Sequence, residues 1–299
     1  MPYFVLAAGV AIVSTASILI RYAQADGVPS LTIAAGRLLV AALILAPVVW
    51  SRRRGELLAL APRDAWLGVL SGVFLAVHFA TWVSSLAYTS VASSVALVTT
   101  NPLWVGIVSV LIFRERLGAG TLAGIALTIA GSALIFISDS RAQAGPQHSD
   151  PLLGNVLALI GAFSATGYFL IGRSLRKRLS VLAYVGLSYT SAAVLLLLTV
   201  WALDRQILGF SPNAYWVIVA LGIGPQLLGH TAFNWALRYL SATLVAVSIL
   251  GEPVGSAALA YFIFAEGFAP LQLAGFVLLL IGIYSAVASE RSGAAAKSS

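Results

Sequence analysis

Ten apolar stretches, each about twenty residues long, divide the chain of 299 residues. They cover residues 3–21, 31–50, 65–87, 91–113, 119–137, 152–172, 181–201, 214–237, 241–264 and 269–288. A helix of about twenty apolar residues crosses the hydrocarbon core of a bilayer, and it satisfies its backbone hydrogen bonds internally. The sequence therefore predicts an all-α integral membrane protein with ten transmembrane helices.

The composition agrees with a surface that faces lipid, because 60% of the residues are hydrophobic and only 9% are charged. A soluble protein carries roughly 25% charged residues. The net charge of +7 raises the question of nucleic-acid binding, but the basic residues lie in loops between apolar stretches, where membrane topology accounts for them. We therefore expect the lipid bilayer as a partner, no nucleic acid and no obligatory protein partner.

Lys and Arg also predict the orientation, since they gather on the cytoplasmic side of membrane proteins. With the N-terminus in the cytoplasm, thirteen basic residues fall in cytoplasmic segments: Arg52, Arg53, Arg54, Arg63, Arg114, Arg116, Arg173, Arg176, Lys177, Arg178, Arg238, Arg291 and Lys297. The opposite side carries Arg21, Arg141 and Arg205. We expect a multi-pass protein of the bacterial inner (plasma) membrane with both termini in the cytoplasm.

The second half of the chain repeats the first at a constant offset of 151 residues. The matching residues of the first half are Leu86, Tyr88, Ser90, Pro102, Ile112, Phe113, Glu115, Leu122, Ala123, Gly124, Leu127 and Gly131. Their counterparts are Leu237, Tyr239, Ser241, Pro253, Ile263, Phe264, Glu266, Leu273, Ala274, Gly275, Leu278 and Gly282. Each repeat holds five helices, an odd number, so the second repeat must enter the membrane upside down.

This repeat divides the chain into four predicted parts. Residues 1–137 form the first five-helix repeat, and residues 152–288 form the second, inverted one. Residues 138–151 form an extracytoplasmic linker, and residues 289–299 a disordered cytoplasmic tail. Inverted repeats are the architecture by which secondary transporters achieve alternating access.

The repeated stretch from Leu86 to Gly124, and again from Leu237 to Gly275, resembles the EamA repeat of the drug/metabolite transporter superfamily. The proline and the helix-end glutamate that occur in both copies are its most specific parts. The overall form is similar to bacterial YddG-like aromatic amino acid exporters. This resemblance implies ten helices around a central cavity between the halves, and export of aromatic and other apolar amino acids.

Two prolines at matching positions, Pro102 and Pro253, fall near the middle of the fourth and ninth spans, directly after Asn101 and Glu252. Proline removes a backbone donor and crowds the carbonyl four residues earlier. In lipid such a break has to face protein or a water-filled cavity. Paired breaks in inverted halves indicate a site near the membrane midplane, whereas a simple packing kink is the alternative.

Polar residues form stripes on the third and eighth spans, which correspond to each other in the repeat. The stripes consist of His78, Trp82 and Ser85, and of Gln226, His230 and Asn234, with the helix-loosening Gly224 and Pro225 just before the second. Polar side chains within a bilayer usually turn toward the protein interior. We expect both stripes to line the cavity, with hydrogen bonding between helices as the alternative.

Aromatic residues deep within spans complete the expected cavity, namely Trp104, Phe163 and Tyr168. The alternative for each is a position facing lipid or the protein core.

Two charges also lie within spans, Arg37 and Glu252, and each costs on the order of 3 kcal/mol to insert. Glu252 could pair with Arg37, bind a substrate ammonium group or carry protons, and Arg37 could instead extend to the outer surface.

These features favour a secondary transporter, an exporter or facilitator of small neutral amphipathic metabolites, with aromatic and other apolar amino acids the best candidates. A phosphorylated substrate needs several intramembrane Lys or Arg, and only Arg37 lies within a span. Export of another metabolite or drug class, or a channel-like pore, are the alternatives. With no cysteine, no H-E-x-x-H and no nucleophile motif, we expect neither an enzyme nor a metal or other cofactor.

Overall fold

The structure is a computed structural model that describes residues 2–101, 103–104, 107–108, 119–141, 149–236, 238–240, 245, 248–249 and 251–298. Within these ranges the chain is helical and forms no strand. Six helical stretches of the described chain are long and apolar enough to cross a membrane: Pro2–Ala25, Ser30–Leu58, Pro62–Ser85, Pro151–Leu175, Val181–Ala202 and Pro212–Ala236. Shorter apolar helices cover Leu122–Ile135 and Pro270–Gly282. The predicted all-α membrane fold is confirmed.

The first repeat starts with a span made of two helices, α1 and α2, and the later helices follow in chain order. Their bounds are α1 (Pro2–Val13), α2 (Ala16–Ala25), α3 (Ser30–Leu58), α4 (Pro62–Ser85), α5 (Val91–Val98) and α7 (Ala119–Arg141). A serine begins α5, because the Ser90 hydroxyl accepts the backbone N–H of Ser93 at 3.1 Å. Such caps satisfy an N–H group that has no partner in the first turn of a helix.

The second repeat contains an eighth span in three parts. The bounds are α8 (Pro151–Leu175), α9 (Val181–Ala202), α10 (Pro212–Leu221), η1 (Gly222–His230), α11 (Thr231–Ala236), α13 (Gly251–Phe264) and α14 (Pro270–Ser298). The last helix is longer than predicted, since it includes residues 289–298, which we expected to be disordered. The alanines at 294–296 explain the difference, because alanine has the highest helix propensity.

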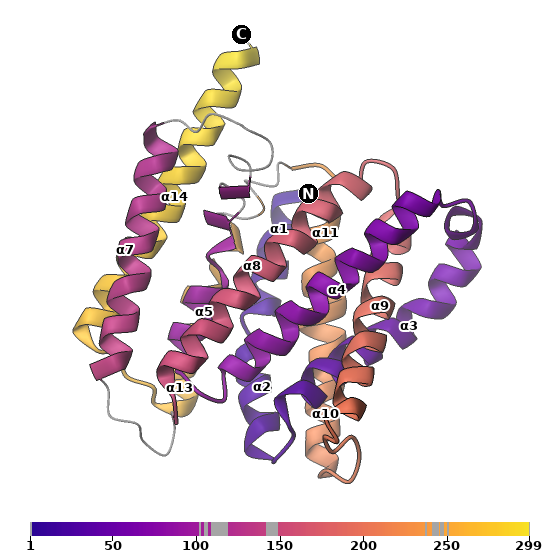
Figure 1. The fold of residues 1–299 in the computed structure, drawn as a ribbon, viewed down its shortest axis with the longest axis horizontal. Helices are drawn as coiled ribbons and strands as arrows, with labels where there is room; N and C mark the ends of the chain where they lie inside the picture. The colour runs from indigo at the N-terminus through magenta and orange to yellow at the C-terminus, as the bar shows by residue number, and fades with distance from the viewer. Residues whose placement is uncertain are drawn as a thin grey trace.

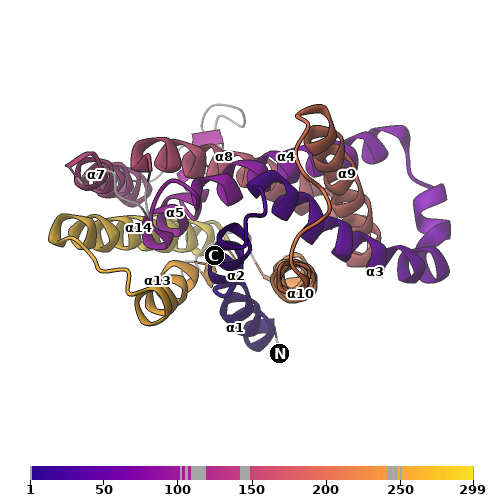
Figure 2. The same ribbon diagram turned by 90° about the horizontal axis from the view of Figure 1, so that it is seen from below.

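Helices of the two repeats pack in matching pairs. The α4 helix packs along α8, and its counterpart, the span of α10, η1 and α11, packs along α1 and α2. Equivalent spans also meet directly, α3 with α9 and α7 with α14. Figures 1 and 2 show α7 beside α14 at one edge of the molecule and α3 beside α9 at the other. The two repeats therefore interlock around a common centre.

Glycines set the contact between α7 and α14. A Cβ atom on Gly131 would lie 2.7 Å from the carbonyl oxygen of Gly275, and one on Gly282 would lie 2.7 Å from that of Gly124. Only glycine fits at such distances. Since Gly124 meets Gly282 and Gly131 meets Gly275, the two helices run antiparallel, as inversion of the second repeat requires. Glycines seven residues apart lie on one face of a helix and allow this close approach.

Candidate functional site

The fourth span is interrupted just before Pro102, the residue at which the sequence predicted a break. The α5 helix ends at Val98, and the Thr99 hydroxyl turns back to donate to the Val95 carbonyl at 2.9 Å. The carbonyl oxygens of Val98 and Ala162 lie 2.9 and 3.0 Å from one amide position of Asn101, so its nitrogen occupies that position and donates to both. The Val98 carbonyl, four residues before Pro102, thus has the partner that a break in lipid requires. Pro102 itself lies outside the described residues.

The eighth span changes its winding as well. Residues Gly222–His230 form a π-helix, η1, which contains both Gly224 and Pro225. Wide π turns within α-helices often occur at functional sites. Both residues were predicted to loosen the backbone here. In the ninth span, Pro253 is buried in the first turn of α13, directly after Glu252.

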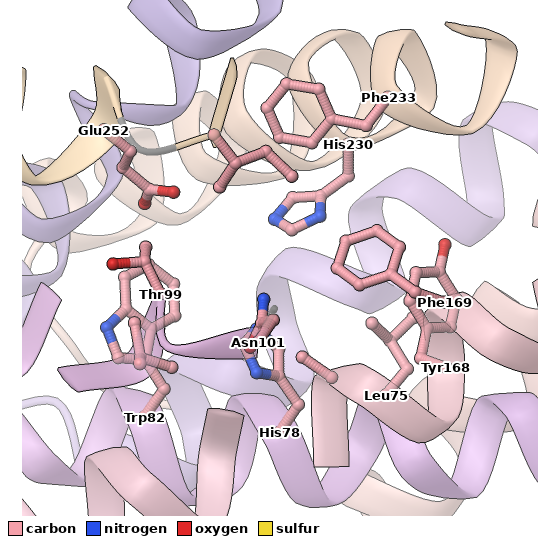
Figure 3. A pocket seen from close by; sticks show the side chains of 13 residues that line it. Leu75, His78, Trp82, Thr99, Asn101, Tyr168, Phe169, His230, Phe233 and Glu252 are labelled. Carbon is pink, nitrogen blue, oxygen red and sulfur yellow. The ribbon is translucent and has the colours of Figure 1, made fainter. Parts of the chain in front are cut away.

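A central cavity lies among these interrupted spans, enclosed by α4, α5, α8, η1, α11 and α13 (Figure 3). It is lined by Leu75, His78, Trp82, Val98, Thr99, Asn101, Ala165, Tyr168, Phe169, His230, Phe233, Ile249 and Glu252. Six of these were predicted: His78, Trp82, Asn101, Tyr168, His230 and Glu252. The free space between them is about 30 Å³, room for one or two water molecules.

Four aromatic rings, those of Trp82, Tyr168, Phe169 and Phe233, line the cavity beside two imidazoles. The His78 ring stacks on Trp82 with centroids 5.9 Å apart, and the His230 ring meets Phe233 edge to face at 5.8 Å. His78 Nδ1 lies 2.9 Å from the Gly161 carbonyl oxygen, which can only accept, so Nδ1 carries a hydrogen. Among the described residues, His230 Nδ1 is buried without a partner. The two imidazoles therefore differ in how firmly they are held.

Glu252 is the acidic residue of this wall. Its side chain is buried, and its carboxylate points into the cavity near Thr99 (Figure 3). Within the described part of the chain, Glu252 forms no ion pair. A carboxylate in this position can accept hydrogen bonds from a cationic or N–H-bearing group that enters the cavity.

Arg37 does not form the predicted ion pair with Glu252, and it does not extend to the surface. It is 0% exposed, and its guanidinium carbon lies 4.0 Å from the centroid of the Phe79 ring and 5.8 Å from that of Trp82. None of its three side-chain nitrogens has a hydrogen-bond partner among the described residues. Arg37 and Glu252 therefore form no direct ion pair, and aromatic faces rather than a carboxylate lie against the guanidinium in a cation–π arrangement.

Three predicted polar residues lie behind the cavity wall. Ser85 shares a 2.6 Å hydrogen bond with Ser94 and so ties α4 to α5. The Asn234 amide donates to the Tyr168 hydroxyl and to the His230 carbonyl, both at 2.7 Å, and thereby positions two lining residues. Gln226 is fully buried, and its backbone carbonyl accepts from the Tyr189 hydroxyl at 3.4 Å.

The two predicted aromatics outside the wall are Trp104 and Phe163, which contact each other edge to face at 5.6 Å. Phe163 is 48% exposed on the outer face of α8, so the lipid-facing alternative applies to it.

Sequence reasoning missed seven lining residues: Leu75, Val98, Thr99, Ala165, Phe169, Phe233 and Ile249. Leu75 and Phe233 are each three residues from a predicted histidine, so helical periodicity could have identified them. The other apolar side chains resemble lipid-facing ones in sequence.

Comparisons with known proteins agree with this architecture. The model of the EamA-like transporter family matches residues 1–137 and 152–288. A solved crystal structure with 19% sequence identity superposes with a TM-score of 0.67, covering 97% of this chain and 98% of that one, which shows a shared fold.

Relatives among curated proteins are also transporters. An uncharacterized transporter from Clostridium kluyveri is 22% identical over 246 residues, which cover 82% of this chain and 79% of that protein. The uncharacterized transporter YetK of Bacillus subtilis is 28% identical over 60% of this chain and 54% of its own length. YwfM of the same organism, also an uncharacterized transporter, is 22% identical over 87% and 85%. The chain belongs to the EamA-like transporter family and is a multi-pass membrane transporter.

Proposed function

We propose that this protein is a secondary transporter that exports or facilitates the passage of small neutral amphipathic metabolites, with aromatic and other apolar amino acids as the favoured substrates. One observation carries the proposal. Among its described lining residues, the central cavity combines one carboxylate with two imidazoles and four aromatic rings.

The ammonium group and the side chain of an apolar amino acid each have a matching group in this wall. The Glu252 carboxylate can accept hydrogen bonds from the ammonium group. Such hydrogen bonds between charged groups are strong, because the protein interior has a low dielectric constant. The rings of Trp82, Phe169 and Phe233 offer apolar and edge-to-face contacts to the side chain. The described lining holds no Lys or Arg, which argues against a phosphorylated substrate.

The small cavity supports an alternating-access cycle rather than a permanent pore. A free volume of about 30 Å³ is far below the several hundred Å³ of ordinary small-molecule sites. An amino acid can therefore enter only after the helices around the cavity move apart. Rocking of one inverted repeat against the other is the motion by which such folds open to each side in turn.

We also propose that the protein lies in the bacterial inner (plasma) membrane with both termini in the cytoplasm. The basic-residue asymmetry in the loops supports this orientation. The substrate is then a small molecule that reaches the cavity from the cytoplasm. The lipid bilayer surrounds the protein. No protein partner is required for this mechanism.

The test is counterflow in proteoliposomes that contain the purified full-length chain. Vesicles loaded with unlabelled phenylalanine or tryptophan are expected to accumulate the labelled amino acid transiently, and the uptake is expected to saturate. Lysine, glutamate and a sugar phosphate serve as comparison substrates. Linear, non-saturable flux would support the channel-like pore, and counterflow restricted to another metabolite class would overturn the amino-acid assignment.

A further inference from the structure

A second and much larger cavity opens at the end of the molecule that we assign to the cytoplasm. It has a volume of about 710 Å³, against about 30 Å³ for the central one. The C-terminal part of α3, the end of α8 with the turn after it, and the turn after α11 form its walls. The lining residues are Arg53, Glu56, Arg173, Arg176, Lys177, Arg178, Leu179, Ser180, Arg238 and Leu240.

The lining has a large excess of positive charge, with six basic residues and one acidic one. The acidic residue, Glu56, accepts the backbone N–H of Ser180 with one carboxylate oxygen. Arg178 forms an ion pair with Asp64, outside the lining, at 3.0 Å. Within the described chain, the other five basic residues of the lining have no ion pair.

Arg176 is built into this wall rather than extended into water. It is 5% exposed, and its guanidinium donates to the Leu179 carbonyl and, at 3.3 Å, to the Asn234 carbonyl. Burial lowers the pKa of Arg176, and the positive charge of Arg238 lowers it further. The fold thus holds like charges together at a cost in free energy that a bound anion would offset.

The positive-inside rule accounts for basic loops, but not for their convergence on one cavity. Arg52, Arg54 and Arg63 obey the same rule and are exposed outside the cavity. The cavity residues come from three segments that are far apart in sequence and meet only in the folded chain. Several guanidinium groups around one space fit the tetrahedral oxygens of a phosphate group, which they can bind in bidentate fashion.

We propose that this basic cavity binds a phosphate-bearing anion, namely the headgroup of an anionic phospholipid of the cytoplasmic leaflet. Its position at the end of the transmembrane helices matches the depth of lipid headgroups, and basic pockets between such helices bind anionic lipids elsewhere. Its volume accommodates a phosphodiester headgroup, while the acyl chains remain beside the helices. The site is separate from the central cavity, so the proposal stands without the proposed substrate.

Two triple variants, each of which removes three positive charges, test the site. One is the triple variant Arg173→Gln, Lys177→Gln, Arg238→Gln, which alters the cavity lining. The matched control is Arg52→Gln, Arg54→Gln, Arg63→Gln, which removes three exposed charges at the ends of α3 and α4 that do not line it. Thermal unfolding of each detergent-purified protein without ligand first establishes that both are folded. A shift in unfolding temperature is then measured during titration with short-chain phosphatidylglycerol, phosphatidylcholine or inorganic phosphate.

Phosphatidylglycerol is expected to raise the unfolding temperature of the wild-type and control proteins, and phosphatidylcholine is not. The cavity variant is expected to bind on the order of 100-fold more weakly, about fivefold for each charge removed. Native mass spectrometry should show retained anionic lipid on the control and loss on the cavity variant. Equal behaviour of the two variants would overturn the proposal. A shift with inorganic phosphate as large as that with lipid would support the phosphate site and overturn its lipid source.

Discussion

His78 and His230 face each other with ring centroids 6.5 Å apart, one from each repeat (Figure 3). The repeat therefore supplies the central cavity with one imidazole per half. Their bonding differs, since His78 donates to the Gly161 carbonyl on α8, whereas His230 Nδ1 has no partner in the described chain. We expect His78 to hold two helices together and His230 to contact the substrate.

Replacing each histidine by leucine separates these roles. His78→Leu is expected to destabilise the protein by about 0.5–1.5 kcal/mol, because it removes the hydrogen bond from His78 Nδ1 to the Gly161 carbonyl. His230→Leu removes no hydrogen bond of its imidazole and is expected to leave the unfolding temperature almost unchanged, while transport falls. Thermal unfolding and proteoliposome counterflow on both variants check this. Reversed effects would show that the assignment of the two roles is wrong.

Glu252→Gln keeps the shape of the side chain and removes its charge. Transport of apolar amino acids is expected to fall by about 10- to 100-fold, because a hydrogen bond to a charged group contributes about 1.5–3 kcal/mol. Since no ion pair joins Glu252 to Arg37, the double variant with Arg37→Leu is not expected to recover transport. Counterflow at matched protein content is the measurement, and wild-type rates in the single variant would remove Glu252 from the mechanism.

Arg37→Met tests whether the buried guanidinium supports the fold. Burying a charge without a hydrogen-bonded partner is unfavourable, and methionine fills a similar volume. We expect the variant to be as stable as the wild type or more stable, with Arg52→Met as an exposed control of equal charge change. A clear drop in unfolding temperature for Arg37→Met alone would mean that its contact with Phe79 outweighs the burial of the charge.

Gly131→Ala is expected to destabilise the contact between α7 and α14 by about 1–3 kcal/mol through overpacking. A Cβ atom there would lie 2.6 Å from the Leu279 backbone nitrogen. Gly55→Ala is the control, because nothing lies within 4 Å of a Cβ at that helical position and alanine favours helix. Thermal unfolding of both variants is the measurement. Equal stability of the two would contradict the close packing of this helix pair.

Single introduced cysteines test the orientation of the protein. They give no background labelling, because the natural sequence contains no cysteine. Arg53→Cys and Lys177→Cys are expected to resist an impermeant thiol reagent in intact cells and to react after lysis. Leu208→Cys, in the exposed loop between α9 and α10, is expected to react in intact cells. The opposite pattern would reverse the proposed topology and would place the basic cavity outside the cytoplasm.

The sequence by itself determined the features that depend on periodicity and composition. The apolar spans follow from hydropathy, and the inversion follows from a gap-free repeat of five spans. The glycines at seven-residue spacing share one helix face, a pattern that lets helices pack closely. The prediction that His78, Trp82 and Glu252 line the cavity has a similar basis, because polar and charged groups within lipid turn toward the protein interior.

Only the tertiary structure decided which neighbour each side chain meets. Arg37 lies against Phe79 because α3 and α4 pack there, and no spacing along α3 encodes that contact. Phe163 and Tyr168 lie on the same helix, yet one is half-exposed and the other is buried, because only one face of α8 meets α4 and α9. The basic cavity also arises in the fold alone, since Arg53, Arg176 and Arg238 are far apart in sequence. Local pattern sets which groups a helix presents, but packing between distant segments sets their partners.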